Sequence, residues 1–194
     1  MLKKICFILG SRANYSSIKA VMSEIQKDTF FDLQLILTTS SILSRYGDIT
    51  DIVKNDGFKI NEKIFTFIEG ETPSTMAKST GLSIIEFTSA LSKLKPDIAL
   101  VVADRYETLA AAISASYMNI FLAHTQGGEI TGSIDESVRH ATTKLAHIHF
   151  PATKKSKQNL IKMGENPKNV FNFGCPSMDL INQNNLKIDQ KFIK

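Results

Sequence analysis

The sequence predicts an α/β fold, in which helices cover both faces of a doubly wound, mostly parallel sheet. Short apolar runs alternate with longer helical patterns along most of the 194 residues. Several of the short runs are apolar throughout, as is typical of parallel strands that are buried on both faces. Regular strand–helix alternation of this kind favours one parallel sheet with right-handed crossovers.

Each element follows from a local pattern. The short apolar runs predict strands at Lys4–Leu9, Leu33–Thr38, Ile60–Phe67, Ile98–Val102, Ile120–Ala123, His147–Phe150 and Val170–Phe173. The longer patterns predict helices at Tyr15–Lys27, Pro73–Leu94, Tyr106–Met118, Ile134–Ala146 and Lys154–Met163. We expect one domain over residues 1–181. The polar residues 182–194, rich in Asn, Gln and Lys, are expected to form a tail or the start of an interdomain linker.

The composition is that of an ordinary globular protein, with 43% apolar and 22% charged residues. The formal net charge of +4 is spread along the chain and gives no specific support for nucleic-acid binding. Cys6 and Cys175 show no disulfide pattern, which fits a reducing compartment. No apolar run has the length of a signal-peptide core or of a membrane span. We therefore expect a cytoplasmic protein that binds neither nucleic acid nor membrane.

Polar residues follow three of the expected strands, at the strand ends where open α/β sheets bind ligands. Gly10-Ser11-Arg12 leads from the first strand into a helix, and its backbone amides and guanidinium suit a phosphate. Asp104 and Arg105 follow the fourth strand, and His124-Thr125-Gln126 ends the fifth. We expect these loops to meet at one rim of the sheet. The alternatives are a tight turn with an exposed arginine and an N-cap carboxylate at Asp104.

A glycine-rich loop follows Gln126 and carries two further carboxylates, Glu129 and Asp135. Irregular loops commonly carry function, and its glycines allow a close backbone approach or a positive φ. Arg139 and His140 come one helical turn after Asp135, so that carboxylate, guanidinium and imidazole could share a face. The alternatives are a solvated turn, a helix cap at Asp135 and a plain i,i+4 ion pair.

His147 and His149 alternate along an expected strand, which would place both rings on one face. Without a third ligand at a recognisable spacing, we expect no metal site. The GxSxG pattern of a nucleophile elbow does not occur in the sequence, which disfavours serine hydrolase chemistry. The candidate chemistry therefore depends on the carboxylates, arginines and histidines at the strand ends.

Four segments resemble the hydrolysing UDP-N-acetylglucosamine 2-epimerases, particularly the branch of sialic and legionaminic acid synthesis. They are GSRANY at residues 10–15, DRYETLAAA at 104–112, HTQGGEITGSIDESVRHATTKLAHIHF at 124–150 and GCPSMD at 174–179. The resemblance covers essentially the whole chain, and the third segment is specific. It implies a Rossmann-like domain that is one half of a glycosyltransferase-B-type architecture, with the UDP-sugar bound between this half and an absent C-terminal domain.

The resemblance implies that UDP is released together with an N-acetylmannosamine-type sugar. Elimination gives a 2-acetamidoglucal, to which water then adds, without a metal or nicotinamide cofactor. Asp104 and Asp135 match acidic positions tied to catalysis, and Arg12 and Arg105 match cations near the nucleotide. Gln126 departs from the pattern, because a glutamate often stands there and an amide cannot exchange protons. Glu129 or another residue would then take that role, or this branch handles a related sugar.

These inferences divide the candidate residues into two groups. The residues expected to contact the substrate are Arg12, Arg105, His124, Arg139 and His140. The residues expected to carry the chemistry are Asp104, Gln126, Glu129 and Asp135. The alternatives are a non-catalytic nucleotide-sugar-binding module, a glycosyltransferase of the same architecture, and an epimerase acting on a UDP-2,4-diacetamido-trideoxyhexose. Family members are about twice as long, so the isolated chain is expected to be weakly active or inactive. An apolar face left exposed by a missing domain would favour a homo-oligomer.

Overall fold

The computed structural model describes residues 2–70 and 72–183, and its centre is a six-stranded sheet. The strands are β1 (Lys3–Leu9), β2 (Phe31–Thr38), β3 (Glu62–Ile64), β4 (Ile98–Val102), β5 (Phe121–Thr125) and β6 (Ile148–Phe150). Their order is β3-β2-β1-β4-β5-β6, and all neighbours are parallel. The predicted doubly wound parallel sheet is therefore confirmed. The strand order reverses between β1 and β4, which is where such sheets bind ligands.

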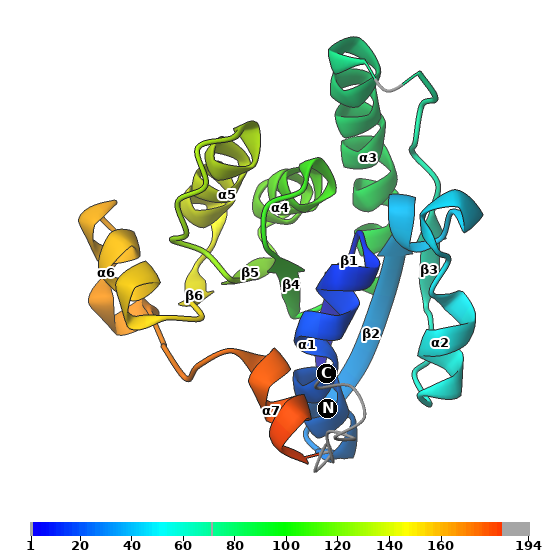
Figure 1. The fold of residues 1–194 in the computed structure, drawn as a ribbon. Helices are drawn as coiled ribbons and strands as arrows, with labels where there is room; N and C mark the ends of the chain where they lie inside the picture. Colours follow the sequence, from blue (N-terminus) through cyan, green and yellow to red (C-terminus); the bar gives the residue numbers. More distant parts are fainter. Residues whose placement is uncertain (1, 71, 184–194) are drawn as a thin grey trace, which may run out of the picture.

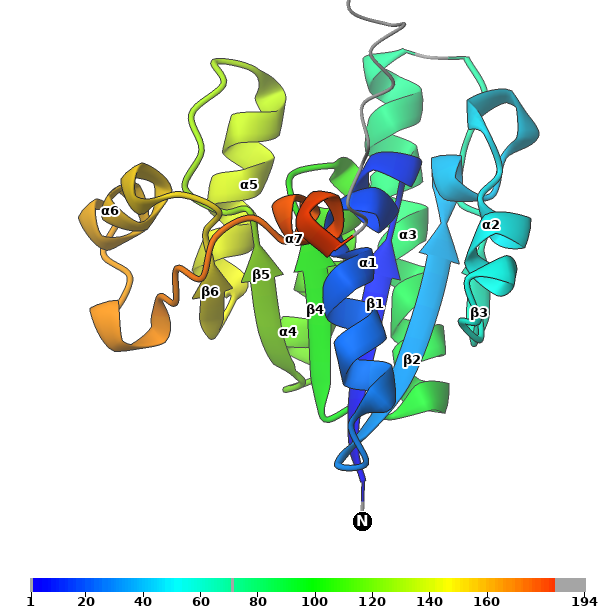
Figure 2. The same ribbon diagram turned by 60° about the horizontal axis from the view of Figure 1, so that its bottom comes forward.

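Helices cover both faces of the sheet (Figures 1 and 2). One face carries α3 (Pro73–Leu94), α4 (Tyr106–Tyr117) and α5 (Ile134–Leu145). The other face carries α1 (Arg12–Lys27) and the short α7 (Pro176–Gln183). At the two edges lie α2 (Thr50–Asn55), beside β3, and α6 (Lys154–Lys162), beyond β6. This arrangement leaves the carboxyl ends of the strands at one rim.

The side chains of the strands alternate between two buried cores. Phe7 of β1 packs with Met22 of α1 in the core on the α1 side. Its neighbour in sequence, Ile8, packs with Phe87 of α3 in the core on the opposite side. Phe7 and Phe87 are fully buried, and replacing a phenylalanine of this kind with alanine typically costs about 3–5 kcal/mol. Packing on both faces holds the strands in place and so fixes the position of the rim where they end.

The expected strand at Val170–Phe173 does not form. Val170 makes one isolated bridge to His149, and the chain then leaves the sheet. Pro151, which follows β6, has no N–H group to continue a ladder of hydrogen bonds. Asn172 instead donates a side-chain hydrogen bond to the carbonyl oxygen of Pro151 at 2.7 Å. The prediction of a seventh strand is wrong because the partner strand lacks a donor at that position.

Other helix and strand boundaries differ from the predicted ones by a few residues. The strand predicted at Ile60–Phe67 is shortened to β3. Helix α1 begins three residues before the predicted start, because the Ser11 hydroxyl accepts a hydrogen bond from the Asn14 amide at 3.1 Å. The tail predicted from residue 182 begins inside α7, and residues 184–194 lie outside the described residues. Among the described residues, no helix is long and apolar enough to span a membrane.

Candidate functional site

A cleft of about 510 Å³ opens at the carboxyl ends of β1, β4 and β5. Its walls come from the loops after these three strands and from the beginning of α5. Most of the predicted site residues line it: Asp104, Arg105, Gln126, Glu129, Asp135 and Arg139. Residues far apart in the sequence therefore meet at the rim, as the strand-end rule predicts.

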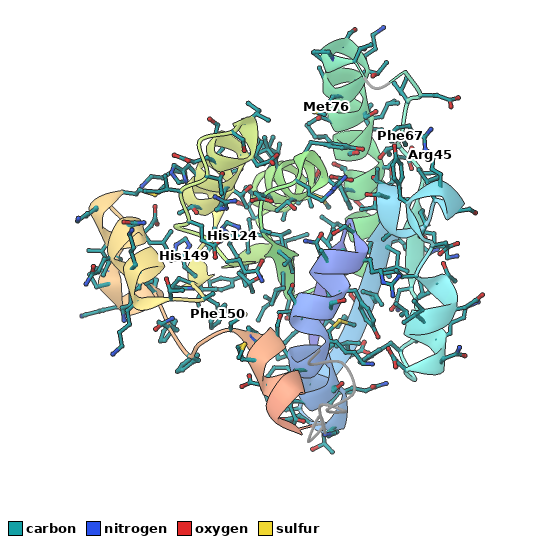
Figure 3. The ribbon with its side chains drawn as sticks, in the orientation of Figure 1. Arg45, Phe67, Met76, His124, His149 and Phe150 are labelled. Carbon is teal, nitrogen blue, oxygen red and sulfur yellow. The ribbon has the colours of Figure 1, made fainter. Side chains whose placement is uncertain are left out.

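A second pocket, of about 450 Å³, adjoins the cleft and shares Ser11 and Arg105 with it. Arg12 is exposed and lines this pocket rather than the cleft itself. Phe67 lies in the wall of this pocket, and Met76 lines both the pocket and the cleft (Figure 3). The guanidinium of Arg45 lies 4.4 Å from the centre of the Phe67 ring and braces that wall. Two arginines, Arg12 and Arg105, thus line one continuous depression.

Asp104 lies two residues after the end of β4 and forms an ion pair with Arg139 of α5. Nη2 of Arg139 donates to Oδ2 of Asp104, and Nη1 donates to the carbonyl oxygen of Glu129 at 2.7 Å. The Arg139 side chain is only 3% exposed, whereas that of Asp104 is 22% exposed. The N-cap of α4 is Arg105, without a side-chain capping bond, so Asp104 does not act as a helix cap. One buried guanidinium instead ties the end of β4 to the glycine-rich loop.

Arg105 is oriented by Glu107, a residue that no sequence pattern singled out. Oε2 of Glu107 lies 3.2 Å from Nε of Arg105, and Oε1 lies 3.3 Å from Nη2. Glu107 is almost fully buried, which raises its pKa although the charge of Arg105 opposes the rise. Burial would lower the pKa of Arg105, but Glu107 and Asp135 raise it overall. Arg105 is therefore a firmly held cation. The sequence feature that could have identified Glu107 is that it is the lone carboxylate in an alanine-rich helix.

The glycine-rich loop is pressed against α6. A Cβ atom at Gly128, which has φ +81°, would lie 2.3 Å from the carbonyl oxygen of Ser156. The side-chain amide of Asn159 donates to the carbonyl oxygen of Gly128 at 2.8 Å. Only glycine fits at this position, because the backbone is both left-handed and in close contact with another helix. The loop is thereby held where Glu129 can line the cleft.

Glu136, rather than Asp135, fastens the second half of the loop. Its Oε2 accepts hydrogen bonds from the amides of Thr131 and Gly132, both at 2.7 Å. These two bonds lower the pKa of Glu136. His140 has its Nε2 3.7 Å from Oε1 of Glu136 and is not among the residues that line the cleft. The ion-pair alternative therefore describes His140 better than a substrate contact, while Asp135 is exposed and lines the cleft.

His124 and His149 are buried neighbours on β5 and β6 (Figure 3). Nε2 of His124 lies 2.8 Å from the carbonyl oxygen of Ala103, and Nδ1 lies 3.3 Å from the hydroxyl of Thr143. Burial lowers the pKa of His124 to about 4, so the ring is neutral at physiological pH. The side chain has no exposed surface. The expectation that His124 contacts the substrate is therefore corrected, because the ring lies beneath the cleft.

The two histidines that could have suggested a metal do not share a face. His147 lies just before β6 and stacks on Phe121, with ring centres 4.8 Å apart. His149 is buried, with Nε2 3.1 Å from Oε2 of Glu165. In the part of the chain that the structure describes, no group of three or more His, Cys, Asp or Glu side chains could hold a metal ion. The thiols of Cys6 and Cys175 are both free.

The sequence is similar to a known protein family and to several of its members. Residues 23–194 match the protein family described as UDP-N-acetylglucosamine 2-epimerase. The chain is 39% identical over 183 residues to a UDP-N,N'-diacetylbacillosamine 2-epimerase (hydrolyzing) from Legionella pneumophila. It is 34% identical over 184 residues to a GDP/UDP-N,N'-diacetylbacillosamine 2-epimerase (hydrolyzing) from Campylobacter jejuni. Both alignments cover 94% of this chain and 48% of the relative, so the chain spans about half the length of the curated relatives it matches.

Structure comparison supports the fold assignment. The UDP-GlcNAc 2-epimerase of Neisseria meningitidis bound to UDP-GlcNAc superposes with a TM-score of 0.80 at 24% identity, covering 95% of this chain and 50% of that one. A lipopolysaccharide outer core galactosyltransferase superposes with a TM-score of 0.61 at 11% identity, covering 87% and 44%. These likenesses confirm the predicted Rossmann-like fold, as one half of a glycosyltransferase-B-type architecture.

Proposed function

The chain belongs to the UDP-N-acetylglucosamine 2-epimerase family, and on that premise we propose that it supplies the acid–base half of a hydrolysing UDP-sugar 2-epimerase. The reaction converts a UDP-linked 2-acetamido sugar and water into UDP and the free sugar epimerised at C2. The observation that carries the proposal is the convergence of Asp104, Asp135 and Arg105 on one cleft at the switch point of the sheet.

The chemistry needs two proton transfers. One group removes the proton from C2 while the C1–O bond to UDP breaks, which leaves a 2-acetamidoglucal. Water then adds at C1, and a proton returns to C2 on the opposite face. Asp104, Glu129 and Asp135 line the cleft and can exchange protons, whereas the Gln126 amide cannot. We assign the transfers to these three carboxylates, with Asp104 and Asp135 as the principal pair.

The departing UDP carries negative charge that must be stabilised as the C1–O bond breaks. Arg105 lines the cleft and is permanently charged, and its Nε edge is already held by Glu107. Arg12 stands in the adjoining pocket, at the first position of α1, where helix amides also favour an anion. We propose that these two arginines bind the phosphates from this side of the cleft.

The substrate class has two candidates. The family description names UDP-N-acetylglucosamine, and so does the name of a Neisseria meningitidis relative that is 30% identical. The two relatives at 39% and 34% identity are named for N,N'-diacetylbacillosamine, which favours a UDP-2,4-diacetamido-trideoxyhexose as the second candidate. In either case we propose that a further domain closes the cleft, that the chain associates with itself, and that the enzyme works in the cytoplasm.

The experiment that tests the proposal compares Asp104→Asn with wild type in a protein of the relatives' full length. Each protein is incubated with both UDP-sugars, without an acceptor, and UDP and the free sugar are measured. We expect wild type to release both products and Asp104→Asn to lose at least a hundredfold in turnover with its fold intact, in line with about 10²–10⁴-fold for an acid–base group. Asp51→Asn, on the exposed side of α2, is the matched control and should be unaffected.

Each alternative has its own result. A nucleotide-sugar-binding module would bind UDP-sugar without releasing UDP, and Asp104→Asn would change nothing. A glycosyltransferase would release UDP only when an acceptor is added and would not yield a free 2-epimerised sugar. The 194-residue chain alone is expected to release UDP slowly. Turnover near that of a full-length protein would contradict the proposal that this chain is half of the enzyme.

A further inference from the structure

Two non-glycine residues with left-handed backbone lie next to each other at the end of the sheet. Ala103 and Gln126 both have φ +61°, and they follow Val102 and Thr125, which are partners in the β4–β5 ladder. A left-handed conformation costs a non-glycine residue roughly 1–2 kcal/mol. Such residues persist only where their surroundings hold them, and they cluster at functional sites. Ala103 immediately precedes Asp104.

Hydrogen bonds hold Ala103 on both sides. Its amide donates to the carbonyl oxygen of Thr125 at 3.1 Å. Its carbonyl oxygen lies 2.8 Å from Nε2 of His124. A carbonyl can only accept, so Nε2 must carry the proton. Nδ1 of the neutral ring is then an acceptor, and the hydroxyl of Thr143, 3.3 Å away, is placed to donate to it. The network thus selects one tautomer of His124.

The glycine-rich loop closes over the same ring. A Cβ atom at Gly127 would lie 3.2 Å from Nδ1 of His124 and 3.2 Å from the hydroxyl of Thr143. The loop backbone therefore lies directly against the imidazole, and His124 has no exposed surface. The charged and titratable groups that act on the ring are Arg139 and His149. A ligand in the cleft cannot reach His124, but the ring contacts both the β4 end and the loop that carries the cleft residues.

Asp104 is therefore held in two independent ways. Arg139 holds its carboxylate, and the residue before it has its carbonyl held by His124. Rotating the Ala103 peptide would move the Cα–Cβ direction of Asp104, and with it the carboxylate. We propose that His124 is a positioning residue, which holds Ala103 in its left-handed conformation and so aims Asp104 at the substrate. This inference rests on the proposed function, in which Asp104 transfers a proton.

The test uses two substitutions that differ in one hydrogen bond, made in a protein of the relatives' full length. His124→Gln keeps an N–H donor near the position of Nε2, whereas His124→Phe keeps the ring and removes the donor. We expect His124→Phe to lower kcat by about 10–100-fold with KM nearly unchanged, by analogy with the residues that orient metal ligands. His124→Gln should restore most of the rate. If His124→Phe does not fold, His124→Asn replaces it, because its shorter amide cannot reach the Ala103 carbonyl.

A third substitution tests the strain directly. Ala103→Gly removes the steric cost of a positive φ, so the left-handed turn depends less on the hydrogen bond from His124. The loss caused by His124→Phe should therefore be smaller in the Ala103→Gly background than in wild type, as a non-additive double-mutant cycle. Equal losses in both backgrounds, equal effects of Phe and Gln at position 124, or a loss confined to KM would each overturn the positioning role.

Two controls separate this inference from the proposed function. If wild type releases UDP and Asp104→Asn does not, but His124→Phe keeps its kcat, only the positioning role fails. If wild type releases no UDP, the proposed function fails and takes the role of His124 with it. A long-range ¹H–¹⁵N spectrum of the 194-residue chain reads the tautomer without any turnover. A His124 ring protonated only at Nδ1, or charged at neutral pH, would overturn the anchor itself.

Discussion

Breaking the ion pair between Asp104 and Arg139 gives the most direct test of how the rim is built. Arg139→Leu removes the donor to the Asp104 carboxylate and the donor to the Glu129 carbonyl. Removing one partner of a buried ion pair typically costs about 3–5 kcal/mol, because the other charge stays behind uncompensated. The Asp104 side chain is 22% exposed, so water replaces part of what is lost. We therefore expect a loss of about 2–4 kcal/mol in the free energy of unfolding.

The reverse substitution should cost at least as much. Asp104→Leu leaves the Arg139 guanidinium, which is only 3% exposed, without its carboxylate. The double variant with leucine at both positions should be more stable than the sum of the single losses predicts. The difference is expected to be about 1.5–3 kcal/mol, the value of a hydrogen bond to a charged group.

Urea unfolding of the 194-residue chain, followed by circular dichroism, measures these free energies. Arg12→Leu is the matched control, because Arg12 is exposed at the start of α1. A surface substitution of this kind should stay within about 0.5 kcal/mol of wild type. The reasoning is refuted if Arg139→Leu is no more destabilising than Arg12→Leu, or if the two leucine substitutions are simply additive.

Three further predictions follow from the parts around the cleft. Gly128→Ala should prevent stable folding, because its Cβ would lie 2.3 Å from a backbone oxygen of α6. Gly132 also has a positive φ of +73°, but no atom lies within 4 Å of its Cβ position. Gly132→Ala should therefore lower the free energy of unfolding by only about 1 kcal/mol. Thermal unfolding of the two variants compares them, and equal losses would contradict the clash. Acidification should destabilise the protein between pH 6.5 and about 4, since the unfolded chain binds a proton at His124 in that range and the folded chain does not. The contribution of the neutral His124 to the free energy of unfolding is fully present above pH 6.5. His124→Phe should reduce the slope of the free energy of unfolding against pH between pH 6.5 and about 4. An unchanged slope would contradict the role given to His124. Glu107→Gln should leave the free energy of unfolding nearly unchanged, because it removes a buried charge while water can still reach the partner, Arg105. In a full-length protein it should weaken UDP binding, because Arg105 is held less firmly. Calorimetry can measure this loss of affinity.

The fold could be predicted because its signals are local. Continuous apolar runs predict buried parallel strands, and the helices predicted to begin at Pro73 and Lys154 begin there in the structure, each after a threonine whose hydroxyl caps it. The failure at Val170 has a non-local cause. Whether an apolar run joins a sheet depends on the donors of the neighbouring strand, and the proline after β6 removes one. No property of the run itself carries that information.

The site could be predicted only in its outer part. The strand-end rule brings Asp104, Gln126 and Asp135 to one rim without any knowledge of side-chain contacts. It does not say which polar residue faces the ligand and which lies beneath. Every residue of β5 after Phe121 is buried, so the sequence around His124 shows no alternation from which its orientation could be read.

Residue type misleads most where a charged or titratable group is buried. His124 looks like a substrate contact because exposed imidazoles often are, yet it has no exposed surface and is bonded to the protein. Arg139 lines the cleft but is only 3% exposed, and its guanidinium is bonded to Asp104 and to the Glu129 carbonyl. Glu107 was not singled out, although it holds a cation of the cleft. Keeping such groups buried is costly unless each is paired, and here each is paired with a residue at the rim or the backbone beside it. The rim is therefore built of two layers of residues. Substitutions in the outer layer should change KM or the chemistry itself, whereas those in the inner layer act through the geometry of Asp104 and Arg105: His124 should affect kcat, and Glu107 the binding of UDP.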